Sequence, residues 1–88
     1  MTFQATDQFD AALAKIKNPK LDERVLQIIE EIEKAEQLKD IRNIKKLKGY
    51  RNAYRIRIGD FRLGFYLEND TLTFDFVGMR KEFYRFFP

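Results

Sequence analysis

The sequence predicts an α+β domain in which an N-terminal helical hairpin packs on a small antiparallel β-sheet. Residues 54–77 alternate apolar with polar side chains and are divided by a Gly-Asp and an Asn-Asp dipeptide, as in strands joined by tight turns. Residues 7–36 instead place their apolar side chains at helical spacing. The apolar face of the sheet can cover the helical stripes, which predicts a two-layer arrangement. We expect one domain, residues 1–88, because a chain of this length has room for one core.

The composition excludes several kinds of site. The chain has no cysteine, so it can form neither a disulfide framework nor a thiolate metal site, and a reducing compartment suits it. It has no histidine, which removes the commonest general base and the commonest metal ligand. There is no apolar run of about 18 residues and no signal-peptide pattern. We therefore expect a soluble, cytoplasmic protein with no membrane contact, no metal and no other cofactor.

The N-terminal residues predict a strand followed by a helix. Residues 1–5 alternate, with Phe3 as the buried side chain, and we expect a first strand that pairs with the others. Thr6 or Asp7 can cap the first helix. Its apolar residues are Phe9, Ala12, Leu13 and Ile16. The Asn-Pro pair at 18–19 ends this helix, because proline disfavours the helical conformation in the residue before it.

A second helix is expected to start near Lys20, with one apolar stripe opposite an acidic run. The stripe consists of Leu21, Val25, Ile28, Ile29 and Ile32. We interpret the acidic run, residues 30–36, as the solvated face of this helix. Residues 38–48 follow as a connector in which Ile44 and Leu47 are expected to lie under the edge of the sheet.

Two-residue turns at 59–60 and 69–70 fix the register of the three strands. The second turn leads to a pairing of Leu63 with Phe76. In this register the apolar residues of all three strands share one face, with Phe76 among them and Val77 on the opposite face. Such agreement between turn and pattern is what a real sheet requires.

The opposite face of the predicted sheet collects arginines. It carries Arg55, Arg57, Arg62, Tyr66 and Asp75. The first turn places Arg57 directly across from Arg62, and like charges opposed across strands destabilise a sheet by roughly a few tenths to about 1 kcal/mol. We expect a sequence that keeps such a pair to use it on an anion.

The charge distribution points to the same kind of partner. Residues 1–40 hold six Lys/Arg against nine Asp/Glu, whereas residues 41–88 hold eleven against five. Charge alone is equally compatible with a solvated basic face. Guanidinium groups, however, match phosphate oxygens and stay charged at physiological pH, and nearby tyrosines can stack on bases. The combination favours nucleic acid, with RNA as the candidate.

The same face has some of the groups that RNA cleavage needs. RNA carries its own nucleophile, the 2′-hydroxyl, so an enzyme must orient it, stabilise the developing charge and move two protons. Arginine serves the first two needs, but with a pKa above about 12 it is a poor acid or base near neutrality. Tyr84 is the candidate acid, and Asp75 or Glu82 the candidate base. Scattered carboxylates argue against metal-assisted hydrolysis.

Three segments carry a family resemblance: KKLKG at 45–49, YRIRIGDFRLGF at 54–65 and VGMRKEFYR at 77–85. As a set in this order they resemble the RelE/ParE superfamily of bacterial toxin–antitoxin systems, and the RelE-type toxins in particular. The resemblance implies a helical hairpin on a small antiparallel sheet. It also implies a ribosome-dependent mRNA endonuclease that uses the 2′-hydroxyl and no metal. The implied partners are the ribosome, its mRNA and a cognate antitoxin protein.

Carried over by position, the resemblance implies the site residues. The catalytic candidates are Arg55, Arg57, Arg62, Arg80 and Tyr84. The RNA-binding candidates are Lys45, Lys46, Lys48, Arg51 and Arg85. In two respects the sequence departs from relatives: arginine stands at 55 and 57 where well-known members have lysine, and Met79 stands where many have histidine. A proton-transfer group is thereby missing, which predicts activity that is slow, more reliant on the ribosome, or absent.

Two other functions stay open at this point. A ParE-like inhibitor of DNA gyrase would share the fold, but ParE-type toxins generally lack the arginine and tyrosine that Arg80 and Tyr84 supply. A non-catalytic module that binds RNA or the antitoxin is favoured by the missing histidine. In either toxin, we expect an antitoxin segment to cover the basic face or to displace residues 83–87, whose phenylalanines belong to the core or to a partner contact.

Overall fold

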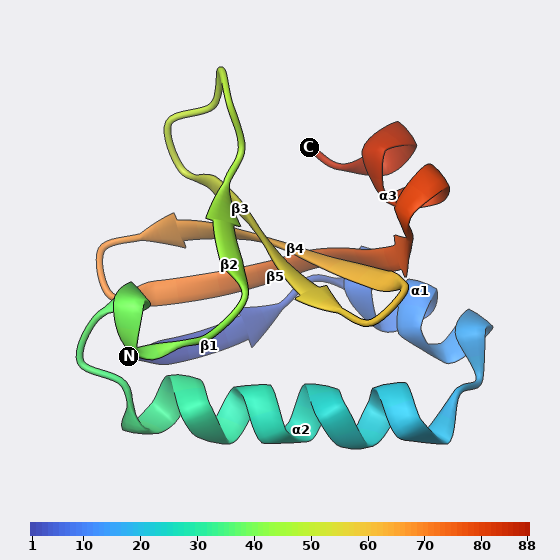
Figure 1. The fold of residues 1–88 in the computed structure, drawn as a ribbon, viewed down its shortest axis with the longest axis horizontal. Helices are drawn as coiled ribbons and strands as arrows, with labels where there is room; N and C mark the ends of the chain where they lie inside the picture. Colours follow the sequence, from blue (N-terminus) through green and yellow to red (C-terminus); the bar gives the residue numbers. More distant parts are fainter.

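The structure, a computed structural model, describes residues 1–88 and confirms the α+β class. Figure 1 shows a twisted sheet with α2 on one side and α3 on the other. The elements in chain order are β1 (Thr2–Ala5), α1 (Asp7–Ile16), α2 (Pro19–Lys34), a 3-10 turn η1 (Leu38–Asp40), β2 (Ile44–Lys46), β3 (Ala53–Ile58), β4 (Phe61–Glu68), β5 (Thr71–Met79) and α3 (Arg80–Phe86). None of the helices combines the length and the hydropathy needed to span a bilayer.

The sheet is larger than the predicted meander and is mixed. Its five strands lie in the order β1-β5-β4-β3-β2. The two strand pairs predicted from the turns, β3 with β4 and β4 with β5, are antiparallel, whereas β1 runs parallel to β5. Residues 44–46, expected to belong to a connector, form the edge strand β2 beside β3. Three residues are too few for an alternation pattern to be recognised in the sequence.

The two N-terminal helices begin where side chains satisfy their free backbone N–H groups. The Thr6 hydroxyl accepts from the Phe9 N–H at 3.2 Å, and the Asn18 side chain accepts from the Leu21 N–H at 3.1 Å. Pro19 occupies the first turn of α2, where its missing N–H costs nothing. The second helix therefore starts at the proline, slightly earlier than the sequence pattern indicated.

The main core lies between this helical pair and one face of the sheet. The apolar stripe of α2 is buried there as predicted, except that Ile29 is only half-buried. The Phe74 ring lies at its centre and contacts Phe3 from β1 and Phe9 from α1, with ring centroids 5.5 and 5.3 Å away. Strand β1 and helix α1 are thus tied to β5 through one fully buried side chain.

A β-bulge at Asp75 overturns part of the predicted register. Phe65 pairs with Phe74 as expected, but Gly64 then pairs with Phe76, and Leu63 pairs with Val77 instead of Phe76. One extra residue in a strand inverts the facing of everything beyond it. Val77 consequently joins the main core with 1% of its surface exposed, and Phe76 points to the face that carries the arginines.

Helix α3 covers part of that second face, so the two-layer expectation is incomplete. Its Phe83 and the adjacent Phe87 are buried against Ala53 of β3 and form a small separate cluster. The approach is closest at Gly64, where an added Cβ would lie 2.5 Å from the Phe87 ring. The missing side chain at Gly64 is what allows the C-terminal segment to lie flat on the sheet.

This contact yields a test of how α3 is held. We expect Gly64→Ala to destabilise the protein by about 1–3 kcal/mol, the range for an overpacked site, because the new methyl group and the Phe87 ring cannot share the space. In a Phe87→Ala background the same substitution should cost much less. Denaturant unfolding of the four proteins in this double-mutant cycle measures the coupling. Equal costs in both backgrounds would show that Phe87 does not press on Gly64.

Candidate functional site

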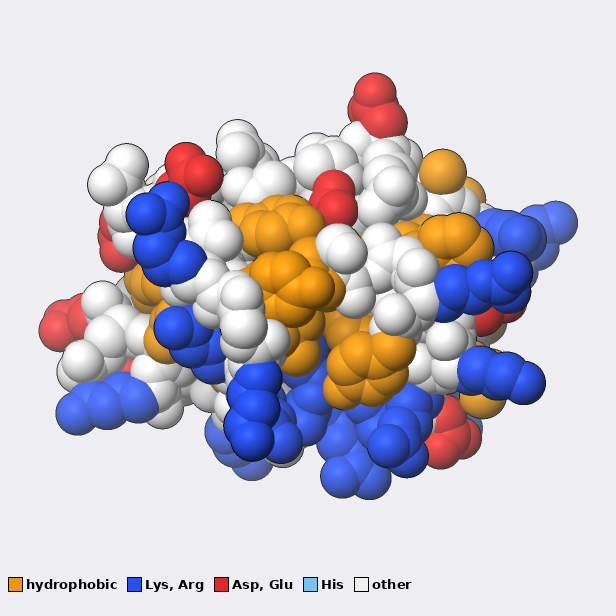
Figure 2. Space-filling model, turned by 90° about the horizontal axis from the view of Figure 1, so that it is seen from above, with side chains coloured by type: hydrophobic (Ala, Val, Ile, Leu, Met, Phe, Trp, Pro, Cys, Tyr) orange, Lys and Arg blue, Asp and Glu red, His pale blue; other side chains and the backbone are white.

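Cations stand opposite one another on the α3-bearing face of the sheet. The pairing of Arg57 with Arg62 is confirmed, and in the next row Lys45 of β2 stands across from Arg55 of β3. Figure 2 shows lysine and arginine side chains gathered along one side of the molecule, next to a band of hydrophobic side chains. The register alone therefore brings four cations together as two directly opposed pairs.

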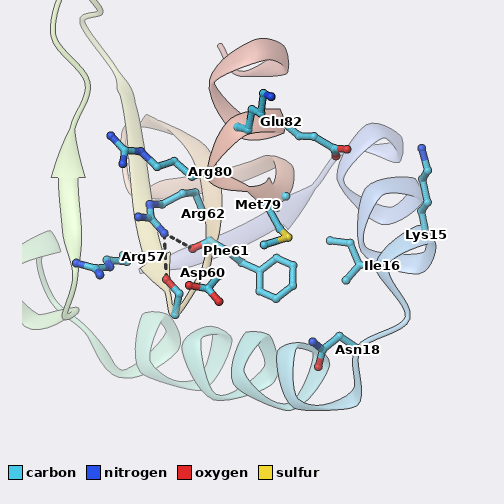
Figure 3. Close-up of a pocket in the computed structure, with 13 residues that line it drawn as sticks. Lys15, Ile16, Asn18, Arg57, Asp60, Phe61, Arg62, Met79, Arg80 and Glu82 are labelled. Atoms are coloured by element: carbon cyan, nitrogen blue, oxygen red, sulfur yellow. Dashed lines mark hydrogen bonds between the residues drawn. The ribbon is translucent and has the colours of Figure 1, made fainter.

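A pocket of about 860 Å³ lies where β4 begins and β5 ends. Three arginines from three elements line it: Arg57 from β3, Arg62 from β4 and Arg80 from α3. Figure 3 shows their side chains reaching toward the same side, while Lys15 lies at the opposite end. The other residues of the lining are Ile16, Asn18, Gly59, Asp60, Phe61, Gly78, Met79, Lys81 and Glu82. Five cations thus share the pocket with two carboxylates.

None of these three arginines forms an ion pair with a carboxylate. The two ion pairs in the structure are elsewhere: the Met1 ammonium with Asp70, and Arg24 with Glu31. The Arg62 guanidinium donates to the backbone carbonyls of Gly59 and Phe61, at 3.0 and 3.1 Å, which holds it at the turn without neutralising it. The pocket therefore keeps an uncompensated positive charge of the kind that an anion can match.

Arg55 lies outside this pocket. Its guanidinium donates a long hydrogen bond of 3.5 Å to the Asn43 carbonyl, and its buried Nε has no partner. Lys45 lies on the same face of the sheet as Arg55. Lys46 pairs with Tyr54 and so lies on the opposite face, which the N-terminal helices cover. Of the other predicted RNA-binding residues, Lys48 and Arg51 belong to the exposed β2–β3 loop.

Tyr84 and Arg85 lie on α3 and do not line the pocket. Tyr84 is 51% exposed, so it is not a core residue, although its ring meets Phe83 edge-on at 5.0 Å. The Arg85 guanidinium lies 5.7 Å from the centre of the exposed Phe86 ring. Both side chains are exposed at the surface.

The two candidate bases have different surroundings. The Asp75 carboxylate accepts hydrogen bonds from the Thr6 hydroxyl at 3.0 Å and the Gln8 amide at 3.2 Å, which ties the bulge to the start of α1. Glu82 lines the pocket with the arginines. Of the two, Glu82 is the carboxylate within the same cavity. No group of three or more carboxylates is placed to hold a metal ion.

Comparison with known proteins identifies the family. No protein-family model matches the chain. A chain of the RelB–RelE antitoxin–toxin complex from Methanococcus jannaschii is 36% identical with a TM-score of 0.81, and the match covers 100% of both chains. This chain belongs to the RelE-like toxins of toxin–antitoxin systems.

Other comparisons agree with the RelE-like assignment. A 42-residue segment is 48% identical to Toxin RelE3 of Methanocaldococcus jannaschii; it makes up 48% of this chain and spans about half, 48%, of that protein. The RelBE2 toxin–antitoxin complex from Mycobacterium tuberculosis has a TM-score of 0.70 at 22% identity, covering 90% of this chain and 96% of the other. At that identity the likeness shows the fold alone.

Two cations of this pocket were not predicted from the sequence. Lys81 follows Arg80 on α3, and Lys15 lies in the last turn of α1, far from the arginines in sequence. Their presence in the pocket depends on how α1 and α3 pack against the end of the sheet. A helical pattern shows which residues are polar, but not which neighbour a polar residue meets.

Tyr66 lies on the arginine face and has a perturbed ionisation. Burial raises its pKa above the ordinary value of 10.0, and the negative charge of Asp75 and the nearby Tyr50 phenol add to this. The ring contacts Phe87 at 5.1 Å. This contact places Tyr66 in the packing under α3.

The raised pKa predicts a specific alkaline sensitivity. Because the folded state favours the neutral phenol, its contribution to stability is full below about pH 10 and is lost as pH rises through the folded pKa. We expect Tyr66→Phe to lose less stability than the wild type over this alkaline range, with Tyr84→Phe as an exposed control. Urea unfolding at a series of pH values measures this. Parallel curves for wild type and Tyr66→Phe would contradict the assignment.

Proposed function

We propose that this RelE-like toxin is a ribosome-dependent mRNA endonuclease that uses the RNA 2′-hydroxyl as nucleophile and no metal. The observation that supports this most strongly is the set of three arginines, Arg57, Arg62 and Arg80, that share one open pocket with no carboxylate partner. Guanidinium forks bind phosphate oxygens in pairs and remain charged throughout a reaction. The arrangement therefore suits a substrate that carries phosphate groups.

In the proposed reaction the arginines hold the scissile phosphate and stabilise its extra negative charge. The 2′-hydroxyl attacks the adjacent phosphorus, the bond to the 5′-oxygen breaks, and a 2′,3′-cyclic phosphate and a 5′-hydroxyl result. Arg57 and Arg62 stand at paired positions of one hairpin, so the strand register already sets the spacing between their backbones. Arg80 approaches from α3 and completes the cradle.

Proton transfer is the weaker part of the site. Glu82 is the base candidate inside the pocket, and Tyr84 is the exposed acid candidate on the same helix. Met79 occupies the strand end where a histidine would provide a better group. We propose that the ribosome compensates by fixing the mRNA in the geometry for in-line attack. Arg55, Lys45, Lys48 and Arg51 extend the basic surface that meets RNA.

A cognate antitoxin is the second proposed partner. The relatives of known structure include the RelB–RelE complex, which is described as an antitoxin–toxin complex, and the DinJ–YafQ complex. The exposed apolar side chains on this chain include Met79, Tyr84 and Phe86, each more than half exposed. An acidic antitoxin segment with apolar side chains would neutralise the arginines and cover these residues together.

The main alternative is a catalytically weak module that binds RNA or the antitoxin. It is favoured by the position of Asp75, whose hydrogen bonds to Thr6 and Gln8 engage it outside the pocket, so that only one of the two predicted bases, Glu82, lines the pocket. Such a protein would bind the same RNA through the same arginines without cutting it. A gyrase inhibitor has less support, because the pocket uses Arg80 of the C-terminal motif.

Cleavage mapped by primer extension separates these functions. We expect the wild-type chain to cut mRNA when ribosomes are present and much less without them. Removing one charge-stabilising donor typically costs about 10²–10³ in rate, so Arg62→Ala and Arg80→Ala should each lower cutting on this scale. Lys34→Ala, an exposed cation at the end of α2, is the matched control and should cut normally.

The outcomes are distinct. Cutting that survives both arginine substitutions would remove the arginines from the mechanism. If the wild type binds ribosomes without cutting mRNA, the non-catalytic module is favoured. If it inhibits supercoiling by purified gyrase, the gyrase inhibitor is favoured. Adding the product of a small reading frame beside the toxin gene should stop the cutting if that product is the antitoxin.

A further inference from the structure

The pocket is longer than the arginine cluster requires. Its lining continues from Arg62 past Phe61 and Met79 to Ile16 and Lys15 at the end of α1. Figure 3 shows the Phe61 ring and the Met79 side chain between the arginines and Lys15. At about 860 Å³ the cavity lies in the range that holds organic ligands of drug size, about 300–1,000 Å³, which is far more than one phosphate group occupies.

In the middle of this pocket lies an exposed apolar side chain, Met79, that is not buried by packing. Met79 stands directly across from Phe61 at the end of the β4–β5 ladder, and it is 53% exposed. Phe61 is half-buried and packs against the main core on its other side. A flexible thioether next to an aromatic ring offers an adaptable apolar surface for a flat ligand group.

We propose that this part of the pocket binds the nucleotide next to the phosphate held by the arginines. The base rests against Met79 and Phe61, and the outer phosphate of that nucleotide meets Lys15. The inference rests on the proposed function, because it assumes that the arginine end holds RNA. It adds a substrate subsite and a phosphate contact from α1, an element that carries none of the arginines.

The order of the lining favours RNA over a small anion or an acidic peptide. Figure 3 shows cations at both ends of the pocket and the apolar side chains of Phe61 and Met79 between them, with the Asp60 carboxylate beside Arg62. Apart from this carboxylate, the order matches that of phosphate, base and phosphate along a single strand. Glu82 also lines the cavity, but no ion pair joins it to Lys15. Lys15 is exposed and remains free for a ligand.

Fluorescence anisotropy with short 2′-O-methyl oligonucleotides, which cannot be cut, tests the subsite directly. We expect a tetranucleotide to bind several-fold more tightly than a dinucleotide. Lys15→Ala should remove most of this gain and lower the slope of log affinity against log salt by about 0.7, the value for one phosphate contact on a single strand. Lys34→Ala should leave both affinity and slope unchanged.

The base contact has its own test within the same assay. An abasic residue is placed at each position of the tetranucleotide in turn. At one position the abasic residue should lower the affinity of the wild type several-fold. Met79→Ser should already bind the intact tetranucleotide more weakly than the wild type, and the abasic residue at that position should lower its affinity little further. Arg62→Ala should weaken every oligonucleotide, the dinucleotide included.

These results separate the subsite from the function on which it rests. If Arg62→Ala weakens RNA binding but Lys15→Ala behaves as Lys34→Ala does, the subsite is wrong and the proposed function stands. If oligonucleotides bind but Arg62→Ala has no effect on their binding, both proposals fail. If no oligonucleotide binds to the wild type, the subsite is wrong, and primer extension with ribosomes decides the proposed function separately. Tetranucleotide binding that is insensitive to the abasic residues at every position would contradict the base contact, and preference for an acidic peptide through Lys15 would overturn the RNA assignment.

Discussion

The repulsion between Arg57 and Arg62 is the unfavourable interaction that the rest of this fold has to outweigh. A two-residue turn, with Gly59 at φ 58°, fixes the register that holds these arginines opposite each other. No carboxylate relieves them. The opposite face of the same strands buries Ile56, Leu63 and Phe65 almost completely, and this burial outweighs a repulsion of at most about 1 kcal/mol. The sheet can therefore hold a charged site in place at small cost.

Both faces of the sheet contribute to building the site. The helical pair seals one face and brings Lys15 to the end of the strands, while α3 covers the other face and delivers Arg80. The bulge at Asp75 turns Phe76 toward α3, where its ring meets Phe86 at 5.5 Å. Without this inversion α3 would lose an apolar neighbour on the arginine face. Backbone irregularity in β5 and the position of the C-terminal arginine are thus connected through packing.

Local chemistry explains which parts of this arrangement could be predicted. Turn residues and alternation determine pairing between neighbouring strands, so the opposition of Arg57 and Arg62 followed from the sequence. The bulge did not, because its extra residue, Asp75, is stabilised by Thr6 and Gln8 from an element remote in sequence. The edge strand β2 was too short to recognise, and the place of Lys15 depended on tertiary packing. The family resemblance supplied Arg80, which no periodicity would have singled out.

The stability of Arg57→Gln tests the central claim most directly. The Arg57 side chain is exposed and forms no ion pair, so if it is kept for a phosphate and not for folding, its removal should relieve repulsion. At low salt we expect the variant to be more stable than the wild type by up to about 1 kcal/mol, with the gain shrinking as salt screens the pair. Arg42→Gln, on an exposed arginine outside the pocket, is the control. A variant that is less stable than the wild type at low salt would show that Arg57 supports the fold, and would contradict the account.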